Sequence, residues 1–401
     1  MELNKVKLGD ICEIYAGGDA PKNTTTYRTE ENRIPVFSNG IENEGLYGFA
    51  SAAKITKPSV TISARGTIGV PFLRKDPYVP IVRLLSAIPK EEKIDLYYLY
   101  YATKLLRYKK DGSVQQQLTV PMLADVTIQI PSLSEQKKIA SVLTALDDKI
   151  ALNKKMNQKL ERMAKRLYDY WFVQYDFPDK NGLPYKTTGG PMTYNPTLKR
   201  EIPVGWEVKT LDEYLDCNKY SLTAKSSSDF IQYLDTSSLT ENTLESLQKY
   251  GSQAESPSRA KRIVYANDIL YSTVRPQQKH YGIIKNPAQN MIASTGFAIL
   301  SCKYGSEYND MFYLFLIQEK NLIKLSAIAD SNASSYPSFN PSDLLNLSIC
   351  LPEDIKTIEP LVKKFSSLFG IIERNQKENQ KLTALRDKLL PLLMNGQVVV
   401  G

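Results

Sequence analysis

Apolar side chains recur at alternating steps of four and three residues in two long, charged stretches of the chain, 132–172 and 353–395. This is the heptad spacing of a coiled coil, in which every seventh residue returns to nearly the same helix face. The first seam consists of Ile139, Leu143, Leu146, Ile150, Asn153, Asn157, Leu160, Ala164, Leu167 and Trp171, and the second of Leu361, Phe365, Leu368, Ile372, Asn375, Asn379, Leu382, Arg386, Leu389 and Leu393. We therefore expect one long helix in each stretch.

The two seams belong to an internal repeat. The eight residues from Asn153, Asn-Lys-Lys-Met-Asn-Gln-Lys-Leu, return 222 positions later from Asn375 as Asn-Gln-Lys-Glu-Asn-Gln-Lys-Leu, identical at six of eight positions. Shorter matches follow in the same order in both halves, including Asp95-Leu-Tyr-Tyr-Leu-Tyr100 with Asp310-Met-Phe-Tyr-Leu-Phe315. The pattern predicts a tandem duplication with pseudo-two-fold symmetry.

The asparagines midway along each seam predict how the helices pair. If facing residue numbers sum to 532 in an antiparallel pair, Asn153 faces Asn379 and Asn157 faces Asn375. A buried layer of asparagines fixes register, because a slipped pairing leaves amides unsatisfied among leucines. The same register sets Leu146 against Arg386, whose charged end can extend to solvent. The alternative is two ordinary core helices that never pair.

The segments outside the seams mix short β-branched or aromatic runs with Gly, Pro and Asn, which is typical of α+β domains. Ser132 and Glu135 form a capping-box pattern at the start of the first helix, and Pro360 suits the first turn of the second. We expect strands at 60–63, 81–85 and 126–130 and helices at 96–107 and 311–324. The expected segments are a globular domain at 1–131, a helix at 132–172, a linker at 173–205, a second globular domain at 206–352, a helix at 353–395 and a tail at 396–401.

Composition favours binding over catalysis. The net charge of +8 and pI near 9.0 favour an anionic partner. The four cysteines form no close pair of the kind used for zinc or redox chemistry, and we expect small buried thiols. The single histidine, His280, lies in a polar stretch that we expect to be an exposed loop. Apolar runs too short for a membrane span and the lack of a secretory signal pattern predict a cytoplasmic protein.

Several phrases along nearly the whole chain resemble the DNA-specificity (S) subunit of type I restriction–modification enzymes. Ile130-Pro-Ser-Leu-Ser-Glu-Gln-Lys-Lys-Ile-Ala140 resembles the entry into that family's first spacer helix, and Tyr170-Trp-Phe-Val-Gln-Tyr-Asp-Phe-Pro178 the exit from it. Ile202-Pro-Val-Gly-Trp206 resembles the start of the second recognition domain, and Leu385-Arg-Asp-Lys-Leu-Leu-Pro-Leu-Leu-Met-Asn-Gly396 the terminal segment. The stretch 352–360 departs from the pattern, since it lacks the Ser-Glu-Gln-Lys phrase of the first copy.

The resemblance implies a subunit without catalytic activity. Each globular domain would be a target-recognition domain for one half of a split duplex DNA site. The helices, at ~39 residues or ~58 Å each, would act as a ruler and as a docking surface for two modification (methyltransferase) subunits. Those partners would carry S-adenosylmethionine, so no cofactor is expected in this chain, and restriction (endonuclease) subunits would complete the enzyme. No membrane partner is expected.

Candidate DNA contacts are basic and polar side chains in turns, because guanidinium and amide groups read base edges and basic groups hold phosphates. Arg65 stands out, since the following Gly66 lets the backbone approach DNA closely, and Arg275 is its counterpart in the second half. The candidates of the first domain are Arg65, Gly66, Thr67, Ser38, Asn39, Tyr27, Arg28, Lys54, Lys57, Gln115, Gln116 and Gln117. Those of the second are Arg275, Gln277, Gln278, Lys279, Ser331, Asn332, Ser334, Ser335 and Tyr336.

Two alternatives from other classes are weaker. An adenine methyltransferase needs a glycine-rich cofactor turn and an Asn/Asp-Pro-Pro-aromatic tetrapeptide, and the sequence contains neither. A coiled-coil scaffold that binds only protein would explain the long helices but not two large domains rich in polar loops. Salt-dependent binding to duplex DNA would separate the scaffold from the recognition subunit.

Overall fold

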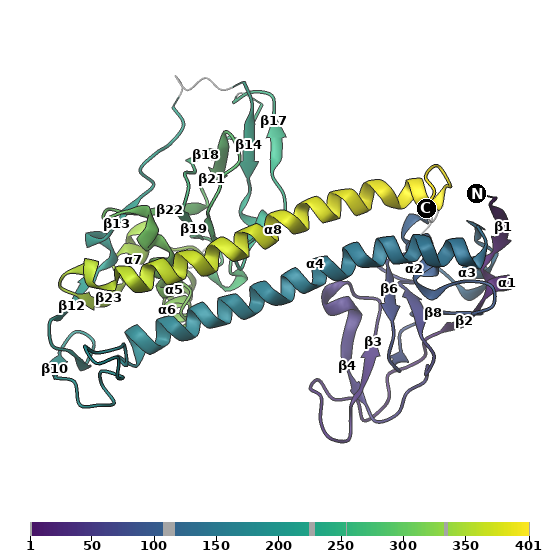
Figure 1. The fold of residues 1–401 in the computed structure, drawn as a ribbon, viewed down its shortest axis with the longest axis horizontal. Coiled ribbons are helices and arrows are strands. Elements are labelled where there is room, and N and C mark those ends of the chain that lie inside the picture. The colour runs from purple at the N-terminus through teal and green to yellow at the C-terminus, as the bar shows by residue number, and fades with distance from the viewer. Residues whose placement is uncertain (1, 107–116, 224–228, 254, 333–335, 401) are drawn as a thin grey trace. The chain divides into compact units, whose positions relative to one another are not determined.

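The computed structural model describes residues 2–106, 117–223, 229–253, 255–332 and 336–400. The chain forms two compact units, of which unit 1 comprises Met1–Leu152 with Glu378–Gly401 and unit 2 comprises Asn153–Lys377. The two long helices are α4 (Leu133–Tyr168), which continues as a π-helical turn to Val173, and α8 (Glu359–Met394). Each unit therefore contains one globular domain and a part of both helices, which can be followed in Figure 1.

Unit 1 has two β-sheets and a terminal strand pair. The inner sheet has the order β2-β8-β5-β6 and the outer sheet the order β4-β3-β7, while β1 pairs with β9. The strands are β1 (Asn4–Lys7), β2 (Cys12–Ala16), β3 (Ile34–Phe37), β4 (Leu46–Ala50), β5 (Ser59–Ile62), β6 (Pro71–Arg74), β7 (Val79–Pro80), β8 (Leu85–Pro89) and β9 (Thr127–Ile130). The short helices are α1 (Leu8–Ile11), α2 (Leu96–Leu105) and α3 (Val120–Asp125).

Unit 2 repeats this plan. Its inner sheet has the order β13-β22-β19-β20 and its outer sheet the order β17-β14-β21-β18, while β12 pairs with β23. These strands are β12 (Trp206–Thr210), β13 (Leu215–Cys217), β14 (Ile231–Leu234), β17 (Gln248–Tyr250), β18 (Ala260–Ile263), β19 (Asp268–Ser272), β20 (Tyr281–Ile284), β21 (Met291–Ser294), β22 (Phe297–Cys302) and β23 (Ser348–Pro352). Two hairpins are added, β10 (Met192–Asn195) with β11 (Arg200–Pro203) and β15 (Leu239–Thr240) with β16 (Thr243–Leu244). The helices are α5 (Asn309–Leu316), α6 (Glu319–Ser331) and α7 (Pro341–Leu345).

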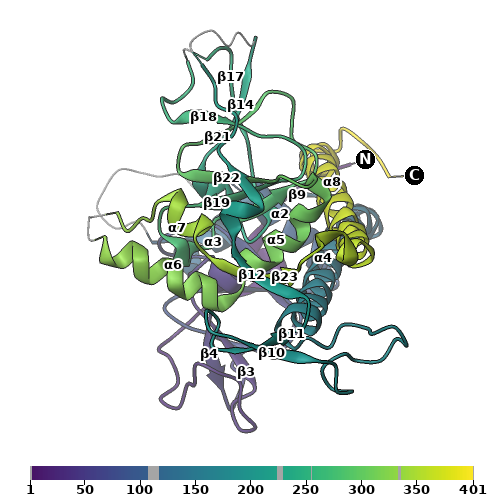
Figure 2. The same cartoon turned by 90° about the vertical axis from the view of Figure 1, so that its left-hand side faces the viewer.

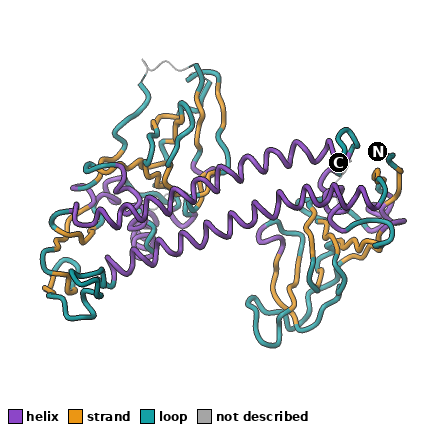
Figure 3. The backbone as a smooth tube through the Cα atoms, in the orientation of Figure 1, coloured by secondary structure: helices purple, strands orange, loops and turns teal. Residues whose placement is uncertain are grey.

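The duplication is visible in the strand pairing. Val6 of β1 faces Ile128 of β9, and Val208 of β12 faces Cys350 of β23, both in antiparallel pairs. Each outer sheet contains one parallel pair of strands, β3 with β7 in unit 1 and β14 with β21 in unit 2. In unit 2 the strands of the outer sheet lie above β19 and β22 of the inner sheet in both views of the ribbon (Figures 1 and 2). The predicted α+β fold with an internal repeat and two long helices is confirmed, and Figure 3 shows strands and helices in both halves.

Two expected elements are wrong in detail. The single helix expected at 311–324 is two helices, because the backbone at Gln318 is extended and Asn321 Nδ2 donates to the Phe315 carbonyl at 2.7 Å. The strand expected at 81–85 is interrupted by a turn, in which Val82 and Arg83 have φ of 53° and 65°. This turn lets the chain leave β7 of the outer sheet and enter β8 of the inner sheet.

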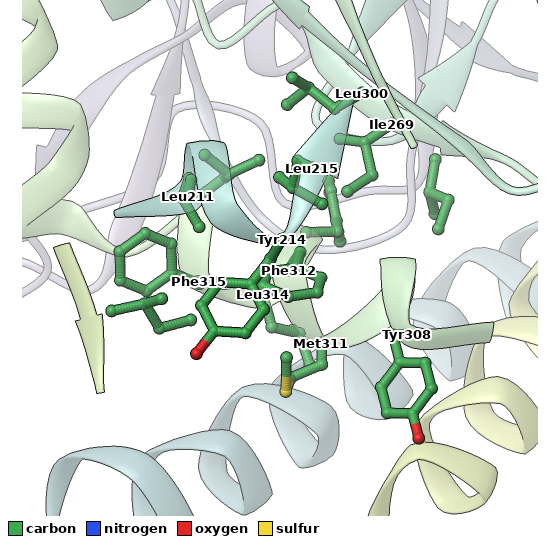
Figure 4. Close-up of a cluster of buried hydrophobic side chains, with 14 of the residues drawn as sticks. Leu211, Tyr214, Leu215, Ile269, Leu300, Tyr308, Met311, Phe312, Leu314 and Phe315 are labelled. Carbon is green, nitrogen blue, oxygen red and sulfur yellow. The ribbon is translucent and has the colours of Figure 1, made fainter. Parts of the chain in front are cut away.

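The cores tie each globular domain to the helices within its own unit. In unit 2, α5 is buried along its whole length and packs Phe312 and Phe315 near Leu211 and Tyr214, as Figure 4 shows. The same core includes residues of α4 and α8, namely Ala164, Tyr168, Leu361, Phe365 and Ile372. The core of unit 1 likewise includes Ile139, Ala140 and Leu143 of α4 and Leu390, Leu393 and Met394 of α8. Burial of these apolar helix residues, some in the seams and some beside them, holds the helices as part of the domains.

A buried polar side chain marks the junction of helix and domain in unit 1. Gln136 is buried, its Oε1 accepts from the Asp95 amide at 2.9 Å, and its Nε2 donates to the Pro131 carbonyl at 3.0 Å. Asp95 in turn caps α2. One bond of the expected capping box is present, since Ser132 Oγ accepts from the Glu135 amide at 3.3 Å. The Gln136 side chain thus fixes the start of α4 against α2.

Unit 2 forms the equivalent junction with an ion pair. Asp310, which matches Asp95 in the repeat, is wholly buried, and its carboxylate lies 2.5 Å from Lys285 Nζ. Ser366 Oγ of α8 donates to the same carboxylate at 3.0 Å. Burial raises the pKa of Asp310, and the Lys285 charge opposes that rise. The second copy, which lacks the Ser-Glu-Gln-Lys phrase, is therefore joined to its helix by Ser366.

Candidate nucleic-acid interface and helix pairing

In unit 1 the loop after β5 presents Arg65. The Arg65 side chain is exposed, and its Nη2 and Nε donate to Gln117 Oε1 at 2.7 and 3.2 Å. The Leu118 amide donates to the Ala64 carbonyl at 2.9 Å, which ties this loop to the segment before α3. Gly66 has a φ of 69°, and an added Cβ would meet no atom within 4 Å. The backbone conformation, not crowding inside the protein, is therefore what favours glycine here.

Asn39 joins the Arg65 loop to its neighbours. Its Oδ1 accepts from the Ala64 amide at 2.7 Å, and its Nδ2 donates to the Val82 carbonyl at 2.6 Å. The Asn39 carbonyl also lies 3.5 Å from Thr67 Oγ1, which donates to it. The structure thus brings together Arg65, Thr67, Asn39 and Gln117, with Ser38 next in the chain and half-buried. A guanidinium fixed in this way loses little side-chain entropy on binding.

The other candidates of unit 1 lie elsewhere or outside the described residues. Tyr27 and Arg28 are exposed on a loop whose Thr25 pairs with Phe49 of β4, so they border the outer sheet. Lys54 and Lys57 are exposed on either side of Ile55, which pairs with Tyr78. Gln115 and Gln116 lie outside the described residues.

In unit 2 the loop after β19 presents Arg275 in the corresponding place. Its backbone has a φ of 47°, its amide donates to the Pro337 carbonyl at 2.9 Å, and its guanidinium lies 5.3 Å from the centre of the Tyr336 ring. Asn332 Nδ2 donates to the Ser338 carbonyl at 3.1 Å. The segment before α7 therefore holds Arg275 much as the segment before α3 holds Arg65. Ser331 ends α6, with its Oγ donating to the Ile328 carbonyl, and Ser334 and Ser335 lie outside the described residues.

The stretch 277–280 is more tightly bonded than expected. Gln277, Gln278 and Lys279 are exposed, but Gln277 Nε2 lies 3.4 Å from a carboxylate oxygen of Asp330, and Lys279 Nζ lies 2.8 Å from Glu241. His280 is half-buried, with Nδ1 3.0 Å from Thr240 Oγ1 and 2.9 Å from the Leu239 carbonyl. The expectation that His280 lies in an exposed loop was wrong, because β20 begins at Tyr281 and draws it toward the β15 hairpin.

Within each unit the two long helices make polar contacts in antiparallel order. In unit 2, Asn375 Nδ2 donates to Asn157 Oδ1 at 2.8 Å, a pair whose residue numbers sum to 532. In unit 1, Arg386 Nη1 lies 2.7 Å from a carboxylate oxygen of Asp147. The Arg386 side chain is 21% exposed and also pairs with Asp387. Its charged end therefore stays beside α4 and does not extend into solvent as expected.

A double-mutant cycle tests the asparagine pair. Asn157→Leu or Asn375→Leu alone leaves one amide without its partner and is expected to cost about 1–3 kcal/mol of unfolding free energy. The double variant is expected to be as stable as the wild type or more stable, with a looser register. Both tryptophans, Trp171 and Trp206, lie in unit 2, so tryptophan fluorescence during urea unfolding reports on it. If the losses of unfolding free energy in the two single variants simply add in the double variant, the pairing of the two asparagines is contradicted.

Sequence reasoning missed three structural features near these sites. The Lys285–Asp310 pair gives no sequence signal, because its partners are distant in the chain and ordinary in type. The Gln136 bonds are missed because Gln136 lies in the Ser-Leu-Ser-Glu-Gln sequence, whose pattern indicates only the start of a helix. The turn at Val82 and Arg83 is missed because a β-branched residue rarely adopts a positive φ.

Metal or thiol chemistry receives no support from the described part of the chain. It contains no group of three His, Cys, Asp or Glu side chains that could hold a metal ion. Cys12 and Cys350 are buried and Cys217 and Cys302 half-buried, and burial raises the pKa of Cys217 and Cys302 to about 11, far from a reactive thiolate. Among the described helices, none combines the length and apolarity needed to cross a membrane.

Comparison with known proteins gives the family. The family described as "Type I restriction modification DNA specificity domain" matches twice, at residues 1–162 and 203–384. The MjaIX specificity subunit of a type I restriction enzyme from Methanocaldococcus jannaschii is 28% identical, over 98% of this chain and 93% of its own. A crystal structure of the type I S subunit from M. genitalium has a TM-score of 0.64 at 16% identity and covers 98% of this chain and 96% of that one. The chain belongs to the type I restriction–modification DNA specificity family, with one copy of the domain in each half.

Proposed function

We propose that this chain is the non-catalytic DNA-recognition subunit of a type I restriction–modification enzyme and reads a split duplex site with its two globular domains. The observation that carries this proposal is the repeated arginine loop. Equivalent strands, β5 and β19, each lead into a turn that presents an exposed arginine, and each turn is bonded to the segment before a short helix. Two similar reading sites in one chain suit a target with two parts.

The chemistry of these turns fits duplex DNA. A guanidinium donates in parallel to N7 and O6 of guanine or to phosphate oxygens. Arg65 now donates to the Gln117 side-chain oxygen, and Arg275 lies against the Tyr336 ring, so both are held before any DNA arrives. The net charge of +8 supplies the general attraction to the DNA backbone.

We propose that the paired helices set the spacing and bind the partner subunits. Each helix has 36 residues, which is ~54 Å at the α-helical rise. A pseudo-two-fold pair of helices suits two copies of one methyltransferase subunit, since each copy meets an equivalent surface. Those subunits would carry S-adenosylmethionine, and restriction subunits would join the assembly. Family membership and the Asn157–Asn375 bond support this arrangement.

The two arginines test the division of labour. In the complex with the methyltransferase subunits, Arg65→Ala is expected to lower methylation about tenfold and to relax the sequence required in one half-site only. Arg275→Ala is expected to do the same in the other half-site, so each variant is the control for the other. Mapping methylated bases in duplex libraries measures both effects. An equal loss in both halves from either variant would contradict separate reading by the two domains.

A protein-only scaffold predicts a different result with DNA. For the recognition subunit, the logarithm of the binding constant of the complex for duplex DNA should fall linearly with the logarithm of the salt concentration. Binding without that salt dependence, or no binding, would favour the scaffold.

A further inference from the structure

Each globular domain has a second turn beside its arginine loop. In unit 1 this is the turn between β7 and β8, where Val82 and Arg83 adopt positive φ and Val82 is 48% exposed. The Val82 amide donates to the Gly18 carbonyl at 2.8 Å and the Arg83 amide to the Gly17 carbonyl at 3.1 Å. A β-branched residue in this conformation is strained, so these bonds hold a shape that the sequence alone would avoid.

The side chain of Asn39 connects the two turns of unit 1. Its amide group accepts from the Ala64 backbone and donates to the Val82 backbone, at 2.7 and 2.6 Å. Ala64 is followed by Arg65 and Val82 by Arg83, and both arginines are exposed. The two guanidinium groups therefore project from loops that are fixed to one another by a single side chain.

The ammonium group of Lys54 lies beside the second turn. A Cβ built on Gly18, whose carbonyl bonds the turn, would lie 3.1 Å from Lys54 Nζ, so that ammonium group borders the turn. Within the described residues, no side chain hydrogen-bonds or ion-pairs with the Arg83 guanidinium, whereas the buried Arg74 of the same unit is paired with Glu44. An exposed, unpaired guanidinium on a rigid turn suits an anionic or base-edge partner.

Unit 2 forms the same arrangement from different residues. The corresponding turn, between β21 and β22, is Thr295 with Gly296, and the Thr273 amide of the Arg275 loop donates to the Gly296 carbonyl at 2.9 Å. The arginine here comes from the neighbouring segment. The Thr295 amide donates to the Arg259 carbonyl at 2.8 Å, and a Cβ on Gly296 would lie 3.1 Å from Arg259 Nη2. Arg259 is exposed, and no hydrogen bond or ion pair joins its guanidinium to another described side chain.

We propose that each recognition domain reads its half-site with two linked arginines, Arg65 with Arg83 in the first and Arg275 with Arg259 in the second. This rests on the proposed function and extends it to residues that the sequence did not indicate. Arg83 and Arg259 contact the DNA beside the position of the first arginine, and Asn39 is the positioning residue that keeps Arg65 and Arg83 in register. In both domains the second arginine lies at the turn that meets the first arginine loop, although the two residues come from different places in the repeat.

Arg83→Gly separates binding from folding. Glycine adopts the positive φ of this position without strain, which offsets its greater freedom in the unfolded chain, so the variant should be about as stable as the wild type while lacking the guanidinium. We expect the complex carrying Arg83→Gly to bind a duplex with the mapped site roughly tenfold more weakly. The loss should depend on the half-site that Arg65→Ala affects, and Arg259→Ala should act through the other half-site. Thermal unfolding of each complex checks that stability is retained.

The outcomes separate this inference from the proposed function. A wild-type complex that methylates no split site would overturn the proposed function, whatever Arg83 does. If the wild type reads a split site and Arg83→Gly leaves both affinity and half-site sequence unchanged, only the two-arginine inference fails. A loss that appears together with a lower unfolding temperature would also overturn it, because Arg83 would then have a structural role.

Discussion

Replacing Lys285 with methionine is expected to destabilise unit 2 by about 3–5 kcal/mol, because it leaves the Asp310 carboxylate buried without its counter-charge. The carboxylate is wholly buried, and the side chain of Lys285 is only 11% exposed. The remaining donor, Ser366 Oγ, cannot compensate for a full charge. Urea unfolding followed by tryptophan fluorescence measures the loss, since both tryptophans belong to unit 2.

The penalty should depend on pH in a definite direction. Burial already raises the pKa of Asp310, and removal of Lys285 takes away the main opposing influence, so the variant's pKa rises further. The folded variant then binds a proton more readily than the unfolded chain, whose carboxyl has a pKa of about 4. Stability of the variant should therefore fall as pH rises from about 4 through the folded-state pKa, and the deficit should shrink in acid.

Two controls define this result. Lys219→Met removes the exposed partner of Asp216 and is expected to change stability by less than about 1 kcal/mol. Lys285→Met combined with Asp310→Leu removes both charges and should recover most of the loss. A Lys285→Met variant as stable as the wild type at neutral pH would show that this ion pair does not stabilise unit 2.

Lengthening both helices is expected to change the gap of the DNA site and leave its half-sites unchanged. One heptad inserted after Lys155 and another after Lys377 preserve the seam and the facing asparagines, because these positions sum to 532. Seven residues add about 10 Å of helix, so the unread gap should grow by at most about three base pairs at ~3.4 Å each. Methylation at the original gap should be lost, and the methylated sites of the complex reveal the new one.

An insertion in α4 alone is the matched control. It sets Asn157 opposite an apolar position and leaves its amide unsatisfied, so we expect lower stability and loss of methylation at any gap. Unchanged gap length in the double insertion would contradict the helices as a ruler. A changed base sequence of either half-site would instead show that the recognition domains themselves had been disturbed.

The long helices and the repeat could be predicted because heptad spacing is a local property of sequence. The same spacing also predicts a tertiary contact, since the hydrogen bond between Asn157 and Asn375 joins residues whose pairing follows from the seams alone. The arginine loops were accessible for a similar reason, because Arg65 and Arg275 follow matching strand patterns. The pattern could not predict the contacts that hold the two arginine side chains, because Gln117, which contacts Arg65, and Tyr336, which contacts Arg275, come from distant segments.

The missed features depend on tertiary structure overriding local preference. Val82 favours a strand by propensity, yet the step from the outer to the inner sheet requires a left-handed turn there, and bonds to Gly17 and Gly18 maintain it. Similarly, the pattern at 311–324 suggests one helix, and only the folded chain shows that α5 ends at Leu316 and that the Asn321 side chain donates to the Phe315 carbonyl. Arg259 lies in the turn just before β18, and no local pattern reveals that this turn meets the one at Thr295 and Gly296.

The most direct test of the account is to express this chain with a type I methyltransferase subunit, purify the complex and map methylated adenines across genomic DNA. We predict a motif with two constant halves separated by a gap of fixed length, because two separate domains read the DNA and paired helices set their spacing. A single uninterrupted motif, or a complex that forms without methylating DNA in any sequence-specific way, would contradict that claim.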